Sequence, residues 1–388
     1  MLSNFSEKII TQINQNVFFK EFTFDKNDFI VANNNKVELA DNVLWIDDLL
    51  IIIQIKEKGN KIEGTPIEKW FENKVLKKAK NQIKNTLRFL DTQRSIAISN
   101  GHDQQFEIIR SNIHQIHNVI IYHPTIAPPE TVYKHKFYLS KDKIFIHIFT
   151  SEDYSHICRY LITPSELNDY LLFRQNLLLA NPNAGLLPEQ YFLAHFFQKP
   201  EDMSIVADYI TTLPDICEAI EKDNSFYLGG LIKMLHDTLK EKGTLDYIHI
   251  VKEFAKLNRF ELRAVKERLL QIIQTEVSKH PLIMKRCASL RTNCGFVVMK
   301  LNPKNETHHF EALKNFTLIF KYKWKLSKCI GLIVKHENEY LDLDWCYVES
   351  DWIYDNELQA LVEQEIKIFA NPAIEHRPWY GELHAKKK

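Results

Sequence analysis

The sequence predicts an α/β protein in which a mixed sheet flanked by helices is followed by a helical region and a C-terminal α/β region. Three observations support this fold class. Strand-like and helical patterns alternate along residues 1–180. Helical patterns dominate residues 181–285, and strand-like runs return within residues 286–388. We therefore predict three regions with these limits.

The composition is that of an ordinary folded protein without a dominant charge. Of the 388 residues, 45% are hydrophobic and 26% are charged, with 50 basic and 50 acidic side chains. This length favours more than one domain. Because the formal net charge is zero, a nucleic-acid partner is not indicated globally, and such a surface would have to be a local basic patch.

Cysteine usage and the absence of long apolar runs predict a cytoplasmic protein. The six cysteines are scattered and form no CxxC pair, so we expect thiols in a reducing compartment, with Cys287 and Cys294 as structural thiols. The N-terminus lacks the apolar core and cleavage site of a signal peptide. No apolar run approaches the length of a membrane span, so we expect no membrane partner.

The first predicted elements are a helix and a hairpin. Apolar residues between Ile9 and Val17 recur at helical spacing. The runs "FFKEFTF" and "DFIVA" are strand-like. Residues 37–59, "VELADNVLWIDDLLIIIQIKEKG", then predict two β-strands separated by a turn at Asp47 and Asp48. The apolar character of these strands predicts helices on both faces.

The next predicted element is a long capped helix. In "TPIEKW", Thr65 is the expected N-cap residue, Pro66 the first helical residue and Glu68 the partner in a capping box. The helical pattern runs to about Asp91. Gln82 falls on the edge of its apolar stripe, where a polar side chain needs a partner or a function.

Further strands and helices complete the pattern. The runs "SIAIS", "HNVIIYHP" and "DKIFIHIFT" predict strands, and Thr163, Pro164 and Glu166 predict a second capping box. Residues 188–285 are mostly helical. Strands are predicted at "GFVVMKL", "FTLIFKYKWKL", "CIGLIVKH" and "LDWCYVE", and a final helix at "NELQALVEQEIKIF".

The polar residues of the predicted hairpin suit phosphodiester hydrolysis, which needs a hard cation held by oxygens. Asp41 and Gln54 supply side-chain oxygens, and the Ile55 carbonyl adds a third. Lys56 is two residues beyond Gln54 and shares its face. It can orient the attacking water or stabilise charge on the phosphate. The expected cation is Mg²⁺ or Mn²⁺.

The spacing D-(x)12-QxK, formed by Asp41, Gln54 and Lys56, resembles the PD-(D/E)xK nuclease superfamily. The resemblance covers roughly residues 1–180 and implies a restriction-endonuclease-like mixed sheet flanked by helices. The phrase "ELAD…LLIIIQIKEK" is also similar to bacterial nuclease-like proteins that carry a large C-terminal region. Residues 181–388 resemble no family that we can name, and we expect them to sense, bind or oligomerise.

The resemblance also implies further site residues and shows two departures. The first helix of the family often donates a glutamate, here Glu7, and the helix across the hairpin carries a Gln or Lys, here Gln82 or Lys78. The usual acid of the second half-motif is replaced by Gln54, and the usual proline by alanine. Glu38 is an extra acid, but it reaches Asp41 only if the chain bends between them.

The function implied is that of a Mg²⁺-dependent endonuclease that cleaves nucleic acid, with DNA favoured over RNA, in bacterial defence against phage or plasmids. The resemblance leaves open a homo-oligomer or a partner protein of a defence system. One alternative is a catalytically degenerate nuclease fold that acts as a scaffold for nucleic acid or a partner. Another is an enzyme that stays inactive until a partner rearranges the C-terminal region.

Plainer interpretations stand beside these predictions. Asp41 and Lys56 also fit an ordinary solvated strand end, Glu7 a solvated helix position, and Gln82 a satisfied buried amide. Asp47 then only forms the turn.

The run "FKYKWKLSK" is a candidate nucleic-acid surface. On a strand, Lys321, Lys323 and Lys325 would share one face and could follow a phosphate backbone. The alternative is a half-buried strand with a solvated side. The histidines form no convincing metal site, and His195 and His236 are expected at the edge of a helical core.

Overall fold

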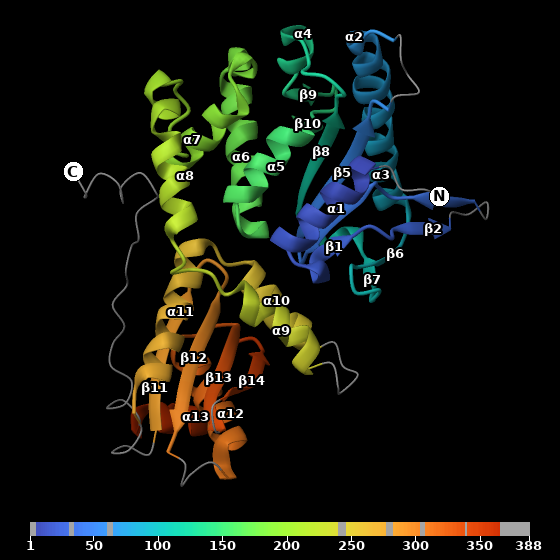
Figure 1. The fold of residues 1–388 in the computed structure, drawn as a ribbon. Coiled ribbons are helices and arrows are strands. Elements are labelled where there is room, and N and C mark those ends of the chain that lie inside the picture. Colours follow the sequence, from blue (N-terminus) through green and yellow to red (C-terminus); the bar gives the residue numbers. More distant parts are fainter. Residues whose placement is uncertain are drawn as a thin grey trace. The chain divides into compact units, whose positions relative to one another are not determined.

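The computed structural model describes residues 5–30, 35–59, 65–239, 246–276, 282–302, 307–337 and 340–364. This part of the chain divides after Lys222 into two compact units, each described by itself (Figure 1). The first unit contains α1 (Phe5–Val17), η1 (Lys20–Phe22), β1 (Thr23–Phe24), β2 (Asp28–Ile30), β3 (Lys36–Glu38), β4 (Asn42–Ile46), β5 (Leu49–Glu57), α2 (Ile67–Trp70), η3 (Phe71–Ala79), α3 (Lys80–Thr92), β6 (Ile96–Ser99), β7 (Gln105–Ile108), η4 (Arg110–Asn112), β8 (Gln115–His123), α4 (Glu130–Tyr133), β9 (Phe137–Leu139), β10 (Phe145–Thr150), α5 (Ser151–Tyr160), α6 (Pro164–Ala180), η5 (Pro182–Leu186), α7 (Glu189–Gln198), η6 (Ala207–Thr212) and α8 (Leu213–Lys222).

A mixed six-stranded sheet forms the centre of the first unit. Its strand order is β1-β4-β5-β8-β10-β9. Strands β5, β8 and β10 run parallel, whereas β1, β4 and β9 pair antiparallel with their neighbours. The predicted hairpin is confirmed as β4 and β5, with Asp47 and Asp48 between them. The predicted fold class, α/β with a mixed sheet, is therefore confirmed.

Helices cover both faces of this sheet (Figure 1). The continuous helix α2–η3–α3 packs on one face, against Ile120 and Tyr122 of β8 and Ile146 and Ile148 of β10. Helices α1, α5 and α6 contact strands of the sheet from the other face. The near-continuous apolar runs of β5 and β8 follow from this burial on both sides.

The capping box expected at Thr65 is wrong. Pro66 has an extended backbone, with ψ of 141°, and the helix begins at Ile67 without a side-chain cap. Thr65 therefore lies too far from the free N–H groups of the first turn to cap them. The end of the helix at Thr92 agrees with the predicted end near Asp91.

The middle of the same helix, η3, is a π-helix over Phe71–Ala79. Its buried residues Phe71, Val75 and Ala79 recur at every fourth position. All three side chains lie on the face of the helix that packs against β8 and β10.

The second predicted capping box is confirmed at its N-cap residue, Thr163. The Thr163 hydroxyl accepts a hydrogen bond from the Glu166 N–H at 3.2 Å, and Pro164 is the first residue of α6. The Glu166 carboxylate accepts from the Ile162 N–H at 3.0 Å rather than from the N-cap residue. Both contacts satisfy N–H groups at the start of the helix.

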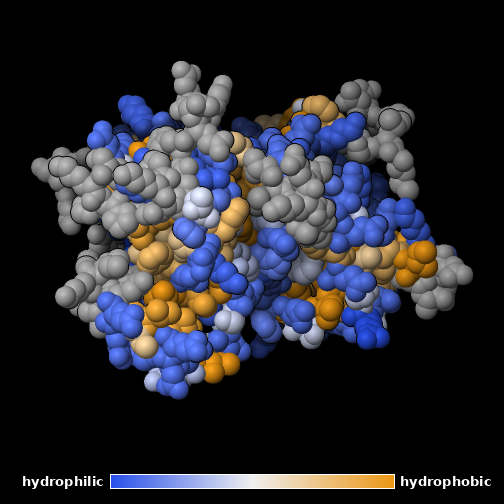
Figure 2. All heavy atoms as spheres, turned by 90° about the horizontal axis from the view of Figure 1, so that it is seen from below, coloured by the Kyte–Doolittle hydropathy of each residue, from blue (hydrophilic) through white to orange (hydrophobic). Residues whose placement is uncertain are grey.

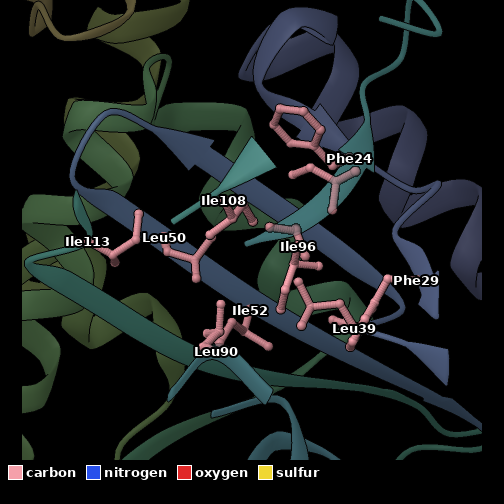
Figure 3. Close-up of a cluster of buried hydrophobic side chains, with 12 residues drawn as sticks. Phe24, Phe29, Leu39, Leu50, Ile52, Leu90, Ile96, Ile108 and Ile113 are labelled. Atoms are coloured by element: carbon pink, nitrogen blue, oxygen red, sulfur yellow. The ribbon is translucent and has the colours of Figure 1, made fainter. Parts of the chain in front are cut away.

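A hydrophobic cluster fixes the hairpin in the first unit (Figure 3). Leu50 and Ile52 of β5 meet Leu90 of α3, Ile96 of β6 and Leu39, which precedes β4. Leu39 is 1% exposed, so its position is set by the core. The chain therefore enters β4 from a buried anchor two residues before Asp41.

The second unit is an α/β arrangement that combines helices of the predicted helical region 181–285 with strands of the predicted C-terminal region. Its sheet order is β11-β12-β13-β14, with β12 and β13 parallel and both outer pairs antiparallel. Strand β11 begins at Leu282, inside the segment expected to be helical. The elements are α9 (Gly229–Leu239), α10 (Asp246–Ala255), α11 (Arg259–Gln274), β11 (Leu282–Ser289), β12 (Cys294–Leu301), α12 (His309–Lys323), β13 (Lys328–Glu337), β14 (Tyr340–Glu349) and α13 (Asn356–Gln364).

The strand expected at "FTLIFKYKWKL" is wrong, because this run forms the end of α12 and the turn after it. Leu313, Thr317, Phe320 and Lys321 are buried at helical spacing. A parallel pair such as β12 and β13 also needs a crossover connection, which α12 supplies. The alternation of lysines with aromatic residues was therefore misleading as a sign of a strand.

Hydrophobic and hydrophilic residues are interspersed on the surface seen in Figure 2. Among the described residues, large apolar side chains that reach solvent include Phe310, Ile353 and Tyr354. Scattered apolar residues are normal on protein surfaces. This surface therefore does not indicate a function by itself.

Candidate active site

The β4–β5 hairpin brings the predicted site residues together. Asn42 pairs with Ile53 in the antiparallel register, so Asp41 comes beside Gln54, one position beyond the last pair. Gln54 and Lys56 alternate with Ile53 along β5 and point to the opposite face. That face of the sheet is the one that α2, η3 and α3 cover.

The ammonium group of Lys56 contacts all three oxygens predicted to hold a cation. Its Nζ lies 2.9 Å from Asp41 Oδ2, 3.3 Å from Gln54 Oε1 and 2.7 Å from the Ile55 carbonyl oxygen. Asp41 Oδ2 also accepts a hydrogen bond from the Ile55 N–H. The side chains of Lys56 and Asp41 are 12% and 9% exposed, so this ion pair is largely shielded from solvent. The four groups therefore form one centre.

The donor set of this centre fits Mg²⁺ in chemical type. It consists of a carboxylate, an amide oxygen and a backbone carbonyl, and hard divalent cations prefer oxygen ligands. It contains only one formal negative charge. Within the described residues, no group of three or more Asp, Glu, His or Cys side chains is arranged to hold a metal. Asp41, Gln54 and the Ile55 carbonyl could together hold such a cation.

A bend in the chain before Asp41 is held by two residues that the sequence analysis did not single out. Asn27 Oδ1 accepts hydrogen bonds from the N–H groups of Leu39 and Ala40, at 3.0 and 3.1 Å. The Thr86 hydroxyl of α3 donates to the Leu39 carbonyl. The bend that Glu38 needs to approach Asp41 is present. No sequence signal marks Asn27 or Thr86, since their partners are distant in the chain.

Glu38 belongs electrostatically to the same centre. Burial by surrounding protein atoms, followed by the negative charges of Asp41, Asp28 and Glu7, raises the pKa of Glu38 to about 7, although Lys56 opposes this rise. The side chain itself still reaches solvent. A carboxylate with this pKa exchanges protons near neutral pH.

Glu7, the helix acid that the resemblance implied, acts on Glu38 from a helix on the other face of the sheet. It occupies the first turn of α1, and its charge acts on Glu38. The start of α1 is tied to the end of β5 by a hydrogen bond of 2.9 Å from the Ser6 N–H to the Glu57 carboxylate. Glu7 therefore lies close to the carboxyl end of β5.

Gln82 lies on the helix that crosses the hairpin. It is one turn before Thr86, whose hydroxyl reaches Leu39 and also contacts the Gln82 carbonyl at 3.1 Å. Gln82 Oε1 is buried and has no hydrogen-bond partner among the described residues. This oxygen is therefore an acceptor that a ligand or water can use. Lys78, the other candidate on this helix, is exposed.

The three lysines predicted to face nucleic acid do not share a surface. Lys321 is 3% exposed and its Nζ donates to Ser350 at 2.9 Å. Lys323 ends α12, and burial followed by the charge of Arg286 lowers its pKa. Lys325 follows the helix, with its ammonium 4.8 Å from the centre of the Trp352 ring. Because the run is helical, the predicted face does not form.

The remaining histidines and cysteines show no catalytic arrangement within the described part of the chain. His195 is fully buried in α7, where its ring packs 4.4 Å from that of Tyr209. His236 is 9% exposed in α9, as expected for a core-edge residue. All six cysteines are free thiols. Burial raises the pKa of Cys294 well above its usual value, so it is not a reactive thiolate.

A second buried polar cluster joins α6 to α7. Arg174 is fully buried and binds Glu189 through two nitrogens, at 2.7 and 3.0 Å. Its other N–H groups reach the Lys136 and Ile148 carbonyls and the His147 ring. Every donor of the guanidinium is satisfied, so this cluster is a structural connection between the two helices.

Comparisons of this chain with protein-family models, with curated proteins and with solved structures give no match. The interpretation of the site therefore rests on its geometry and on the spacing of its residues. In the described ranges, every helix is too short or too polar to cross a membrane.

Proposed function

We propose that this protein is a metal-dependent nuclease of the PD-(D/E)xK type, which hydrolyses phosphodiester bonds of nucleic acid with Mg²⁺ or Mn²⁺. The observation that supports this most strongly is the contact of Lys56 with Asp41, Gln54 and the Ile55 carbonyl at one end of the hairpin. These groups occupy the positions of the motif, with Gln54 in place of its usual acid, and they lie in a mixed sheet flanked by helices.

Each residue has a definite role in this proposal. Asp41, Gln54 and the Ile55 carbonyl would hold the cation, which when bound would supply Lewis-acid stabilisation of the phosphate and lower the pKa of water. Lys56 stabilises negative charge that develops on the phosphate. Glu38, with a pKa of about 7, is suited to accept a proton from the attacking water. Glu7 and Gln82 act as auxiliary groups.

The test is cleavage of plasmid DNA, single-stranded DNA and RNA with Mg²⁺ or Mn²⁺, comparing wild type with Lys56→Ala. We expect metal-dependent cleavage, strongest on DNA, and a loss of at least about 100-fold in the variant. Lys58→Ala is the matched control, because Lys58 follows the same strand and its side chain makes none of these contacts. Equal cleavage by wild type and Lys56→Ala would contradict the proposal.

A second candidate function is a scaffold that binds nucleic acid or a partner without cleaving. The observation in its favour is Gln54, because a neutral ligand leaves Asp41 as the only carboxylate of the three ligands. Gln54→Glu distinguishes the two functions. In a nuclease this variant should keep or increase metal-dependent cleavage. A scaffold that has lost other parts should remain inactive with either residue.

The setting of this activity is part of the proposal and rests on the resemblance alone. We propose a cytoplasmic nuclease in bacterial defence against phage or plasmids, with DNA as the favoured substrate. The second unit would then sense, bind or oligomerise, with a second copy or a defence protein as partner. If the isolated chain is inactive, repeating the assay with cell lysate or candidate partners tests for an activator.

A further inference from the structure

The contacts of Lys56 indicate how cation binding at the proposed site is controlled. Building on the proposed function, we infer that Lys56 is an internal counter-ion that a divalent cation must displace, so that cation binding releases the lysine toward the substrate. The proposal concerns the regulation of the site rather than the identity of its ligands.

The donor capacity of Lys56 is fully used by the predicted ligands. An ammonium group has three N–H donors and no acceptor. Its three hydrogen-bond partners are Asp41 Oδ2, Gln54 Oε1 and the Ile55 carbonyl oxygen, at 2.9, 3.3 and 2.7 Å. The lysine is therefore engaged by the same three oxygens that a divalent cation would use.

The Lys56 ammonium and a divalent cation cannot bind these three oxygens at the same time, because both are positively charged. The ammonium of Lys56 neutralises Asp41, the only charged ligand of the three. A divalent cation on the same oxygens would lie within a few ångströms of a positive nitrogen in a centre shielded from solvent. Two positive charges this close repel strongly, because a centre shielded from solvent screens them little. Binding of the cation therefore requires the ammonium to leave.

The geometry of β5 limits where the released ammonium can go. Lys56 and Gln54 share one face of the strand, and Lys56 lies near its carboxyl end. The charges of Glu7, Asp41 and Lys56 all act on Glu38 near this end of the strand. A phosphate held by the cation would offer the ammonium a negatively charged partner outside the set of three oxygens. The same displacement thus admits the cation and presents the lysine to the substrate.

The first experiment measures affinity rather than cleavage. Mg²⁺ binding by calorimetry and Mn²⁺ binding by electron paramagnetic resonance are compared for the full chain and for Lys56→Met. Because the variant removes the competing charge and keeps much of the side-chain volume, we expect its cation affinity to rise roughly tenfold, although its activity is lost.

Lys58→Met separates displacement from a general effect of charge. It removes one positive charge from the residue two positions further along, outside the set of three oxygens. We expect its affinity to change by less than about twofold, since a more distant and more solvated charge is screened. A similar rise in both variants overturns the inference, as does equal or weaker binding by Lys56→Met.

The outcomes also distinguish this inference from the proposed function. If wild type binds the cation and Lys56→Met binds it no better, only the inference fails. If wild type, Lys56→Met and Gln54→Glu all fail to bind Mg²⁺ and Mn²⁺, both fail. Tighter cation binding by Lys56→Met, with no comparable change for Lys58→Met, supports both the inference and the proposed function.

A second measurement avoids substitutions and therefore any failure of a variant to fold. Lysine acetylation of the wild-type chain is quantified by mass spectrometry with and without Mg²⁺. The Lys56 side chain is 12% exposed and fully hydrogen-bonded, so it should react slowly alone. We expect Mg²⁺ to increase modification of Lys56 but not of Lys58. Unchanged or reduced modification of Lys56 by Mg²⁺ overturns the inference.

Discussion

Glu38 is the residue of the candidate site whose charge changes near neutral pH. Its pKa lies at about 7, against 4.5 for an ordinary glutamate, so the folded chain holds a proton that the unfolded chain has released between these values. Stability must therefore fall as pH rises through this window, and the loss is complete above pH 7. The protein thus loses stability by holding an acidic side chain beside Asp41, which is consistent with a functional role for Glu38.

The variant Glu38→Gln should remove this pH-dependent loss. We expect it to be more stable than wild type by about 1 kcal/mol above pH 7, with the gain disappearing below about pH 4.5. The gain is small because the Glu38 side chain reaches solvent, which screens its repulsion by neighbouring charges. Urea denaturation at pH 8 and pH 4 measures the difference.

Glu107→Gln is the control for this prediction, because Glu107 is an exposed carboxylate of β7. Its free energy of unfolding should equal that of wild type at pH 4 and at pH 8. A gain for Glu38→Gln that is the same at pH 4 and pH 8 would show that the carboxylate is not strained by its neighbours.

Single residues of the site differ in how well the sequence predicts them. Asp41, Gln54 and Lys56 lie on one hairpin, so alternation along a strand and a short turn are enough to bring them together. Glu38 joins them only through a bend held by Asn27. The sequence offers Glu38 as an extra acid, but Asn27 is distant in the chain, so no local pattern reveals the bend that brings Glu38 to Asp41.

At the scale of elements, α3 positions the start of the hairpin through one side chain. The Thr86 hydroxyl contacts the carbonyl oxygens of Leu39 and Gln82. Thr86→Val keeps the shape but leaves the Leu39 carbonyl without this donor. We expect a loss of about 1–2 kcal/mol in unfolding free energy and weaker Mn²⁺ binding, because the bend before Asp41 loosens.

Thr92→Val provides the matched comparison on the same helix. Its hydroxyl also donates to a carbonyl one turn earlier, that of Arg88 at 2.8 Å, but Thr92 is exposed and reaches no strand. This variant should leave Mn²⁺ binding unchanged. If both variants weaken Mn²⁺ binding equally, the contact with Leu39 has no role in positioning the site.

The elements show where local patterns predict structure and where they do not. Strands β5, β8 and β10 were predicted because β-branched runs with clear ends favour strands. Helix α12 was missed because its lysines and aromatic residues alternate like those of a strand. Its true arrangement depends on the parallel pairing of β12 with β13, which no local window contains.

At the scale of the whole molecule, the first unit extends beyond residue 180, and a buried ion pair joins the helices on either side of that residue. Arg174 of α6 and Glu189 of α7 are both almost fully buried and bound through two hydrogen bonds. Burial tends to raise the pKa of Glu189, but Arg174 and Lys136 lower it further, so the carboxylate stays charged. A fragment ending at residue 180 would lack this partner.

Two fragments test this limit directly. Residues 1–222 should fold and keep the cation affinity of the full chain, whereas residues 1–180 should be less stable by about 3 kcal/mol or more. Circular dichroism during urea denaturation measures both. Equal stability of the two fragments would support the limit at residue 180 predicted from the sequence and would contradict a structural role for the Arg174–Glu189 pair.

The compact hairpin also has a consequence for the order of folding. Asp41 and Lys56 are only 15 residues apart, whereas β5 must find β8 across a much longer loop. Hairpins form in about 1–10 μs, well before pairings between distant segments close. The charged centre is therefore expected to assemble early, as a local nucleus onto which the parallel strands are later added.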